Sequence, residues 1–254
     1  MFVEERQNMI STILHKSGKV KVKELSEQFK VTEDCIRKDL SILEKQGVLK
    51  RVYGGAVKVR INAHNLDVKE RKEKNVEIKY EIASKALTLI KNNDMIFLDI
   101  STSNIELAKL LRNSNLDIIV VTNMIDVMLE LTAMSSIKVI FIGGSLNRGK
   151  DGFVGSMANS AIANFKFDIA FMGVVGVDLY DNSVSTYMVD DGLTKKEIIS
   201  ASRKKYMIIE TEKFNMDGTY KYAHVEDFDG IITESKPKDN ILEILKDYKL
   251  ELIY

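Results

Sequence analysis

Cysteine, proline and histidine are scarce in this chain of 254 residues. The single cysteine, Cys35, excludes an internal disulfide, and the single proline, Pro237, falls in a turn expected late in the chain. The three histidines, His15, His64 and His224, are scattered and show no metal-ligand spacing with the cysteine. No spacing typical of a nucleophile and its base appears either. We therefore expect no catalytic residue, no metal and no cofactor.

Long apolar runs are also missing. No stretch approaches the ~20 consecutive apolar residues that a membrane-spanning helix needs. The start of the chain, MFVEERQNMI, lacks the basic end and apolar stretch of a signal peptide. Together with the lone cysteine, these features predict a protein of the reducing cytoplasm that does not enter a membrane.

Neither sign of charge is in excess over the whole chain, since 37 Lys and Arg balance 37 Asp and Glu. The balance hides an asymmetry, because residues 1–60 carry 13 basic and 8 acidic residues, a net charge of +5, and the remainder carries −5. A basic end on an acidic body is typical of a protein in which one part meets a phosphate backbone. With 45% hydrophobic residues, the chain is expected to fold.

Two apolar stripes at helical spacing open the basic end. The first predicts a helix over residues 4–17, which Gly18 would end. The second consists of Val22, Leu25 and Phe29 and predicts a short helix that follows closely. The chain therefore starts with two helices in quick succession.

A third helix is expected to follow Thr32, whose side chain suits an N-cap. Ile36, Leu40 and Leu43 then fall at i, i+4 and i+7, so that they share one buried face. Gly47 would end this helix. The rest of its surface is rich in groups that form hydrogen bonds.

After this helix, Val48–Tyr53 and Ala56–Arg60 predict two short strands around a Gly54-Gly55 turn, which form a β-hairpin wing. Three short helices and a wing can place one helix in the major groove and the wing against the DNA backbone. Arg37 suits a guanine edge, whereas Lys38 suits a phosphate. The candidate DNA-contacting residues are Thr32, Glu33, Arg37, Lys38, Ser41, Lys50, Arg51 and Tyr53.

The pattern predicts three parts: a winged helix-turn-helix domain at 1–60, a charged linker at 61–75 and a larger domain at 76–254. In the larger domain, helical and strand patterns alternate, which predicts an α/β fold with a mostly parallel sheet. The expected strands are 95–99, 117–121, 138–142, 168–172, 206–210, 230–233 and one at the C-terminus. The expected helices are 76–91, 103–112, one between 121 and 138, 156–164, 190–203 and 239–247.

Polar and glycine residues cluster directly after several of these strands. In a parallel sheet, the carboxyl ends of the strands meet at one edge, where ligands of open α/β sheets bind. Hydroxyls, glycine amides and helix N-termini at this edge favour an anion such as phosphate. Such residues also favour ordinary turns, so any one cluster alone is weak evidence. Glu210 follows one strand, and the candidate ligand-binding residues are Asp99, Ser101, Thr102, Ser103, Thr122, Asn123, Gly143, Gly144, Gly173, Gly176, Lys195 and Lys213.

Residues 20–57 closely resemble the signature of the DeoR family of sugar-metabolism repressors. The similarity is most specific at Ile36–Leu40 and at Tyr53–Ala56. Cys35 stands where the family usually has threonine, so a hydroxyl near the DNA end of the third helix is lost. The resemblance implies a DNA-binding transcriptional regulator.

The resemblance extends over nearly the whole chain. Thr122-Asn123, Gly143-Gly144, Lys195 and Lys213 match positions of the family's effector domain, and Phe167–Gly173 resembles another family segment. These matches imply a phosphorylated sugar as inducer and a fold similar to ribose-5-phosphate isomerase and CoA-transferases.

The effector domain also departs from the family pattern. Ser101 stands where the family tends to have glycine, and its side chain would limit how closely the backbone approaches a phosphate. Asp190-Asp191-Gly192 replaces the more usual Glu-Glu-Ala.

Three functional hypotheses remain open at this point. The first is a repressor that binds operator DNA as a homo-oligomer, at least a dimer, and that a sugar phosphate releases. The second is an isomerase-like enzyme, in which Asp99 and Lys213 would act as acid and base. The third is a DNA-binding module whose α/β domain responds to a protein partner.

Overall fold

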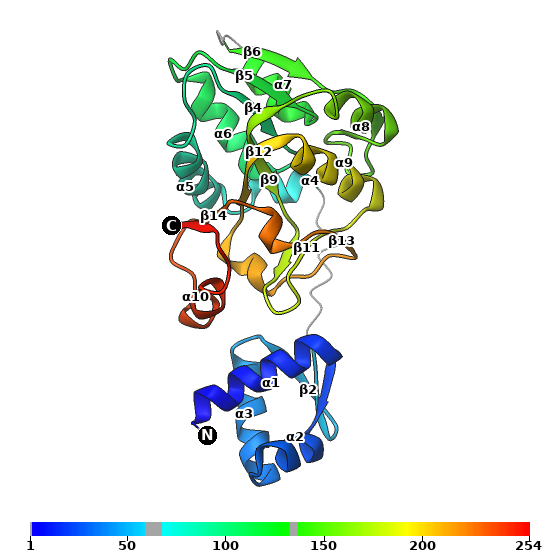
Figure 1. The fold of residues 1–254 in the computed structure, drawn as a ribbon, viewed down its shortest axis with the longest axis vertical. Coiled ribbons are helices and arrows are strands. Elements are labelled where there is room, and N and C mark those ends of the chain that lie inside the picture. Colours follow the sequence, from blue (N-terminus) through cyan, green and yellow to red (C-terminus); the bar gives the residue numbers. More distant parts are fainter. Residues whose placement is uncertain (1, 59–67, 133–136) are drawn as a thin grey trace. The chain divides into compact units, whose positions relative to one another are not determined.

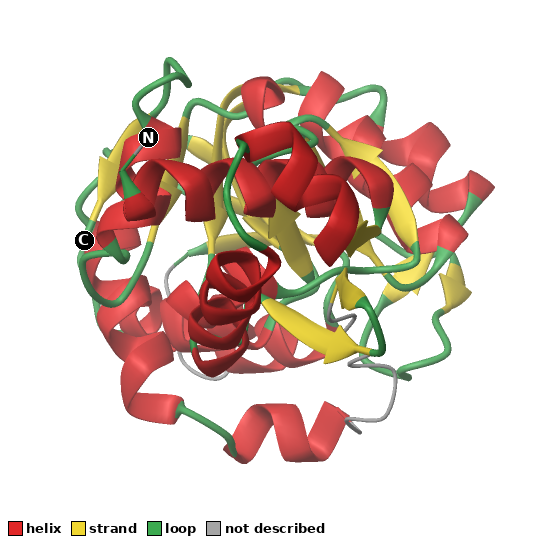
Figure 2. Cartoon of the chain, turned by 90° about the horizontal axis from the view of Figure 1, so that it is seen from below, coloured by secondary structure: helices red, strands yellow, loops and turns green. Residues whose placement is uncertain are grey.

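The computed structural model describes residues 2–58, 68–132 and 137–254. The chain forms two compact units, a small one at the N-terminus and a large one that holds most of residues 62–254 (Figure 1). Figure 2 distinguishes their helices, strands and loops by colour.

The small unit packs three helices against a small antiparallel sheet. Buried side chains from all three helices, among them Leu14, Leu25 and Leu40, form its core. The sheet order within the described residues is β1-β3-β2. The elements are α1 (Val3–Ser17), β1 (Lys19–Lys21), α2 (Val22–Phe29), α3 (Glu33–Lys45), β2 (Leu49–Val52) and β3 (Gly55–Lys58).

The wing differs from the prediction at its turn. Val52 pairs with Gly55, so the two turn residues are Tyr53 and Gly54, and the prediction of a Gly54-Gly55 turn was wrong. Gly55 belongs to β3, where an added Cβ would lie 2.0 Å from the carbonyl oxygen of Val20. Only glycine therefore fits beneath β1, a strand whose three residues are too few to show a pattern in the sequence.

A buried ion pair joins α1 to α3. The Nε of Arg6 lies 2.5 Å from Oδ2 of Asp39, and both side chains are almost fully buried. Gln7 donates a further hydrogen bond of 3.2 Å to the same carboxylate. This network fixes α3 against α1 through polar groups that the apolar periodicity did not reveal.

The large unit is built on a parallel sheet whose order, within the described residues, is β15-β14-β12-β9-β4-β5-β6. Leu98 pairs with both Thr122 and Phe171, so β4 and β5 end level with each other and β9 runs two residues further, to Gly173. The α/β fold with a parallel sheet is thus confirmed. The strands are β4 (Met95–Leu98), β5 (Ile119–Thr122), β6 (Lys138–Phe141), β9 (Phe167–Gly173), β12 (Ser202–Ile208), β14 (Gly230–Ile232) and β15 (Glu251–Ile253).

Helices cover both faces of this sheet (Figure 1). α5 (Val76–Leu87), α6 (Thr102–Arg112) and α7 (Ile125–Thr132) share one hydrophobic core with alternate strand residues. α8 (Ser156–Ile162) and α9 (Val189–Ser200) lie on the other face. α10 connects β14 to β15 and spans Asp239–Leu245.

Several short elements outside the large sheet were not predicted. They include a two-stranded hairpin and a separate small sheet of order β10-β11-β13. Two 3-10 helices, Thr211–Asn215 and Val225–Asp227, flank β13 in the chain. The missed strands are β7 (Ser145–Leu146), β8 (Phe153–Val154), β10 (Gly176–Asp178), β11 (Ser183–Thr186) and β13 (Tyr220–Ala223).

The predicted linker, 61–75, contains a helix. α4 spans Val68–Glu73 and is tied to the large unit by ion pairs of Arg71 and Lys72. Charged side chains hold this helix in place. The sequence pattern did not predict it because it has no apolar stripe. The first half of the predicted linker lies outside the described residues, and the domain boundaries stay a prediction.

Two kinds of feature are absent from the part of the chain that the structure describes. No helix there is long and apolar enough to cross a membrane. No group of three His, Cys, Asp or Glu side chains in those ranges could hold a metal ion.

Candidate functional site

The third helix of the small unit begins as predicted. Thr32 is its N-cap, and the hydroxyl accepts a hydrogen bond of 3.3 Å from the backbone N–H of Cys35. Arg37 is exposed and forms ion pairs within the helix, to Glu33 at 2.6 Å and to Asp34 at 2.8 Å. A guanidinium held this way is oriented but remains available for exchange, because both pairs face solvent.

The other candidate DNA contacts lie along α3 and the wing. Lys38 is exposed and Ser41 is half-buried on α3, while Lys50 and Arg51 are exposed on β2. Tyr53, at the wing tip, is fully exposed. Arg51 pairs with Glu44 at 2.6 Å, which ties the wing to α3. Each predicted residue is therefore on the surface or close to it.

In the large unit, the carboxyl ends of β4 and β9 hold a buried ion pair between Asp99 and Lys195. Lys195 comes from α9 and also donates a hydrogen bond of 3.0 Å to the carbonyl oxygen of Gly173. The backbone N–H of Gly173 donates to Oδ2 of Asp99 at 3.1 Å. Three of the predicted ligand-binding residues thus form one connected cluster.

The surroundings of this pair favour a charged lysine. Burial lowers the pKa of Lys195, but the nearby carboxylates of Asp191 and Asp99 outweigh burial, and the net shift is upward. Burial also raises the pKa of Asp99 to about 6, against the opposing effect of Lys195. The Lys195 ammonium is therefore charged at neutral pH, and Asp99 takes up a proton only under mildly acidic conditions.

Ser101 lies against Gly173. A Cβ added to Gly173 would sit 2.4 Å from the Cβ of Ser101, so glycine at 173 makes room for the serine. The Ser101 hydroxyl accepts a hydrogen bond of 3.3 Å from the N–H of Ser103 and caps α6. The serine thereby occupies one of the amides that a helix N-terminus would otherwise offer to an anion.

Thr122 ends β5 and Asn123 directly follows it, close to the predicted positions, but their roles differ. The Thr122 hydroxyl donates to the carbonyl oxygen of Leu98 at 2.7 Å and accepts from the N–H of Met124. Both hydrogen bonds are made to the backbone of the protein, so its donor hydrogen is already used. The Asn123 side chain donates to Phe153, and its Oδ1 is buried without a partner among the described residues. Of the two, only Asn123 keeps a free acceptor.

Lys213 follows β12 and donates a hydrogen bond of 2.9 Å to the carbonyl oxygen of Val174. Burial lowers its pKa to about 8, and the positive charges of Arg71, Lys79 and Lys195 add to this effect, while Glu210 opposes it. No ion pair of Lys213 with a carboxylate occurs in the described ranges. Its ammonium is therefore poorly compensated.

The predicted glycines do not behave alike. Gly143 is exposed with open space around it, whereas an added Cβ at Gly144 would meet the carbonyl oxygen of Val154 at 2.8 Å. Gly176 lies in the small sheet, where an added Cβ would lie 2.1 Å from the carbonyl oxygen of Met216. Gly176 thus serves backbone packing inside the protein.

Known proteins match both units. Residues 6–61 match the DeoR-like helix-turn-helix domain, and residues 74–235 match the DeoR C-terminal sensor domain. The chain belongs to the DeoR family of transcriptional regulators. This DeoR regulator is thus a DNA-binding protein with a sensor domain, and not an enzyme.

Similar proteins cover nearly its full length. The glycerol-3-phosphate regulon repressor of Escherichia coli K12 is 30% identical over 249 residues, 98% of this chain and 97% of the relative. The lactose phosphotransferase system repressor of Streptococcus mutans is 28% identical over 246 residues, 96% of each chain. Ribose 5-phosphate isomerase A from Methanocaldococcus jannaschii shares part of the fold, with a TM-score of 0.40 and 16% identity over 55% of each chain.

Sequence reasoning missed some polar groups of the DeoR sensor domain. The ring of Tyr222 lies beneath the Lys195 ammonium, 5.9 Å from its centroid, and the Tyr222 hydroxyl is buried without a partner in the described ranges. Asp191 accepts a hydrogen bond of 2.5 Å from Thr186. Tyr222 and Thr186 belong to short strands that the pattern did not reveal, and no signal in the sequence linked them to Lys195.

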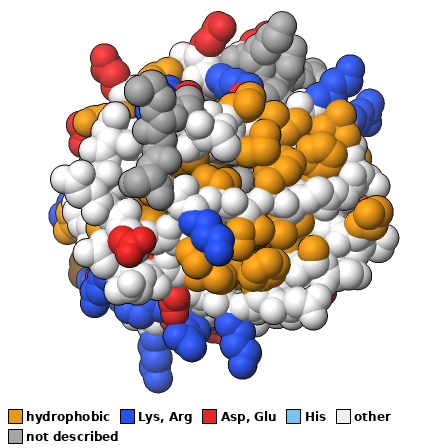
Figure 3. Space-filling model, turned by 90° about the horizontal axis from the view of Figure 1, so that it is seen from above, with side chains coloured by type: hydrophobic (Ala, Val, Ile, Leu, Met, Phe, Trp, Pro, Cys, Tyr) orange, Lys and Arg blue, Asp and Glu red, His pale blue; other side chains and the backbone are white. Residues whose placement is uncertain are grey.

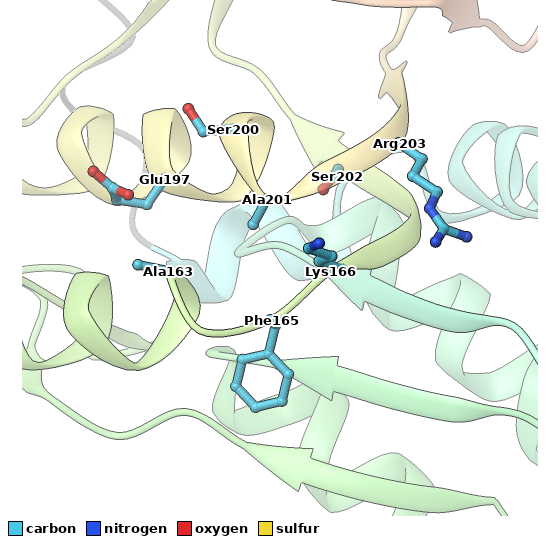
Figure 4. Close-up of a pocket in the computed structure, with 8 residues that line it drawn as sticks. All are labelled: Ala163, Phe165, Lys166, Glu197, Ser200, Ala201, Ser202 and Arg203. Atoms are coloured by element: carbon cyan, nitrogen blue, oxygen red, sulfur yellow. The ribbon is translucent and has the colours of Figure 1, made fainter.

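A shallow depression of about 360 Å³ lies elsewhere on the sensor domain (Figure 4). Residues before β9 and residues before and at the start of β12 form it, so it is at the amino edge of the sheet, away from the predicted ligand residues. Its lining consists of Ala163, Phe165, Lys166, Glu197, Ser200, Ala201, Ser202 and Arg203. None of the predicted site residues contributes to it.

Proposed function

We propose that this DeoR regulator represses a sugar-metabolism operon in the cytoplasm and leaves its operator when a phosphorylated sugar binds at the carboxyl edge of the sheet. The observation that carries the proposal is the pair of ammonium groups there, since the half-buried Lys213 has no carboxylate partner in the described ranges and the buried Lys195 stays charged. A phosphate would supply the missing negative charge.

A ligand that also carries hydroxyl groups suits the same edge. Asp99 Oδ1, Asn123 Oδ1 and the Tyr222 hydroxyl are buried and lack partners among the described residues. Sugar hydroxyls can donate to the two acceptors and accept from the tyrosine, which would remove the cost of leaving these groups unpaired. The names of two relatives, the repressors of the glycerol-3-phosphate regulon and of the lactose phosphotransferase system, agree with such a ligand.

DNA binding is assigned to α3 and the wing. Arg37 and Lys38 are exposed on α3, and Lys50, Arg51 and Tyr53 are exposed on the wing, so these side chains can reach a duplex. We infer that Arg37 reads a base and that the lysines contact phosphates.

The direct test measures binding to DNA from upstream of the operon at fixed salt, with and without a panel of sugar phosphates and the matching free sugars. We expect tight binding that one sugar phosphate weakens and its free sugar does not. Tight DNA binding that no sugar phosphate changes would contradict the effector assignment and favour a protein partner as the signal.

Ligand affinity is expected to fall as the pH rises through about 8, the pKa to which burial lowers Lys213. The ligand's phosphate, with a second pKa of about 6, is a dianion throughout, so the change comes from the protein. A bound dianion raises the lysine pKa, which means that binding takes up a proton above pH 8. Titrations at pH 7 and pH 9 and constant ionic strength should differ by about tenfold.

Lys213→Met is the matched variant for this prediction. It should bind the ligand more weakly at pH 7 and show little change up to pH 9. In the unmodified chain without ligand, Lys213 loses its proton at a lower pH in the folded state than in the unfolded state. The free energy of unfolding of the unmodified chain should therefore rise as the pH rises above about 8, whereas its ligand affinity falls. An unchanged pH dependence of ligand affinity in the variant would contradict the assignment of Lys213.

We assign contact between protomers to the face that carries β6, the edge strand of the sheet within the described residues. Apolar side chains gather on this face (Figure 3). Leu129 on α7, which packs on β6, is exposed, as are Leu146 on β7 and Met157 on α8, and Ile140 and Phe141 of β6 are half-buried. An unpaired strand edge with an apolar surround favours a second copy, and a dimer would present two recognition helices to two half-sites.

Leu129→Lys is therefore expected to convert a dimer into monomers, with a dimer dissociation constant raised at least about tenfold. Sedimentation over a range of protein concentrations measures this. Tyr80→Lys is the control, because Tyr80 is similarly exposed but lies on α5, which packs on α6. Equal self-association of both variants and the unmodified chain would exclude this face.

A further inference from the structure

α4 is fastened to loops at the carboxyl edge of the sheet. Two polar side chains of α4 and two directly after it each reach a side chain from a distant part of the sensor domain, near the start of α7, before β8 or after β12. The contacts are Arg71 to Asp151 at 3.2 Å, Lys72 to Asp126 at 2.7 Å, Lys74 to Glu212 at 3.5 Å and Asn75 to Glu210 at 2.5 Å. α4 therefore belongs to the edge where the ligand is expected.

Arg71 is the member of α4 with an electrostatic link to the proposed anion site. Its charge contributes to the lowered pKa of Lys213, after burial, and so do the charges of Lys79 and Lys195. Arg71 thus lies in electrostatic range of Lys213, one of the two lysines that we assign to the phosphate. A dianion among these cations would relieve their mutual repulsion.

The present partner of Arg71 can be exchanged. Asp151 is buried, and its other oxygen accepts a hydrogen bond of 2.6 Å from Asn147, so this carboxylate keeps a partner without Arg71. The negative charge of Asp151 also raises the pKa of Lys195, so Asp151 lies in electrostatic range of that lysine too. Arg71 itself is about one-third exposed, and within the described ranges its side chain makes one contact, of 3.2 Å to Asp151, which uses one of its five N–H donors.

We propose that Arg71 is an anion-binding residue of the sensor site, and that it exchanges Asp151 for the phosphate of the ligand. Guanidinium groups bind phosphate through two parallel hydrogen bonds, a geometry that a single contact to Asp151 does not use. This inference rests on the proposed function of the same site.

The exchange would change the contacts of α4, the first described helix after the DNA-binding domain in the sequence. Only residues 59–67 separate β3 from α4 in sequence. In one state of α4, Arg71 pairs with Asp151, and in the other it is free to bind the phosphate. A ligand that binds one state better than the other shifts the populations of the two states by that difference in affinity. Ligand binding at the sheet edge therefore changes how α4 is held against the sensor domain.

The test measures binding of inorganic phosphate to the full chain by calorimetry, at pH 7 and constant ionic strength. Arg71→Ala should weaken binding about tenfold or more, because a charge-assisted contact is lost. Asp151→Asn should tighten binding several-fold, because the competing charge is gone. In the double variant, the gain from Asp151→Asn should disappear, since it acts through Arg71.

Lys72→Ala is the matched control, because Lys72 is also ion-paired on α4 but reaches Asp126, which is not among the charges that shift the pKa of Lys195 or Lys213. It should leave phosphate affinity within about twofold of the unmodified chain. Equal losses for Lys72→Ala and Arg71→Ala, or weaker binding by Asp151→Asn, would show that α4 only supports the site and would overturn the proposal. If the unmodified chain binds neither phosphate nor any sugar phosphate, the proposed function falls as well, whereas normal binding by Arg71→Ala removes this inference alone.

Discussion

Replacing Lys195 with methionine is expected to abolish the response to the effector and to lower the free energy of unfolding of the sensor domain by about 3 kcal/mol at neutral pH. The substitution leaves the carboxylate of Asp99 buried without its cation. An uncompensated buried charge either remains at high cost or takes up a proton. Urea unfolding of the variant and the unmodified chain measures the loss.

The loss should depend on pH. Burial already raises the pKa of Asp99 to about 6 with Lys195 in place, and without Lys195 this pKa rises further. A carboxyl whose pKa is higher in the folded state than in the unfolded state stabilises the fold at low pH and loses that contribution as the pH rises. The free energy of unfolding of the variant should therefore be closer to that of the unmodified chain at pH 5 than at pH 8.

A second substitution separates stability from sensing. Asp99→Asn in the Lys195→Met background removes the buried charge and should restore most of the lost stability. It should not restore the effector response, because the ammonium that we assign to the phosphate is still missing. Recovery of the response in this double variant would contradict the role of Lys195 in ligand binding.

Arg37→Ala is expected to weaken operator binding by about tenfold to a hundredfold, the range for loss of one bidentate contact to a base. Its ion pairs to Glu33 and Asp34 are exposed, so the substitution should leave the fold of the small unit unchanged. Binding to operator and to unrelated DNA, each at several salt concentrations, measures the effect. Affinity for unrelated DNA should change much less.

Lys38→Ala provides the contrast. Lys38 is exposed on the same helix, and a phosphate contact from it would weaken binding to all sequences and reduce the slope of log affinity against log salt by about one. Arg37→Ala should leave that slope nearly unchanged. Unaltered operator affinity in Arg37→Ala would exclude α3 as the helix that reads the base.

Local chemistry made much of the fold predictable. Thr32 was expected to cap α3 because its hydroxyl can accept from a free amide, and it does so. The strands of the large sheet were predicted because apolar runs alternate with helical patterns, and the structure confirms this order. The turn of the wing was misplaced by one residue, because either glycine could serve and only the packing of Gly55 beneath Val20 decides.

Contacts between distant residues were not predictable in the same way. Asp99 and Lys195 were each expected near the ligand, but nothing in a segment signals a partner 96 residues away. α4 has no apolar face, so its position depends on carboxylates such as Asp126 and Asp151 far along the chain. The assignment of all these side chains to a ligand stays a prediction.

The fit of Ser101 against Gly173 limits the order in which these two positions can change during evolution. With Ser101 present, any side chain at 173 would collide with it at a distance that real structures do not tolerate. A return from serine to glycine at 101 meets no such barrier and also frees the Ser103 amide. A lineage that modifies its ligand site here must therefore change residue 101 before residue 173.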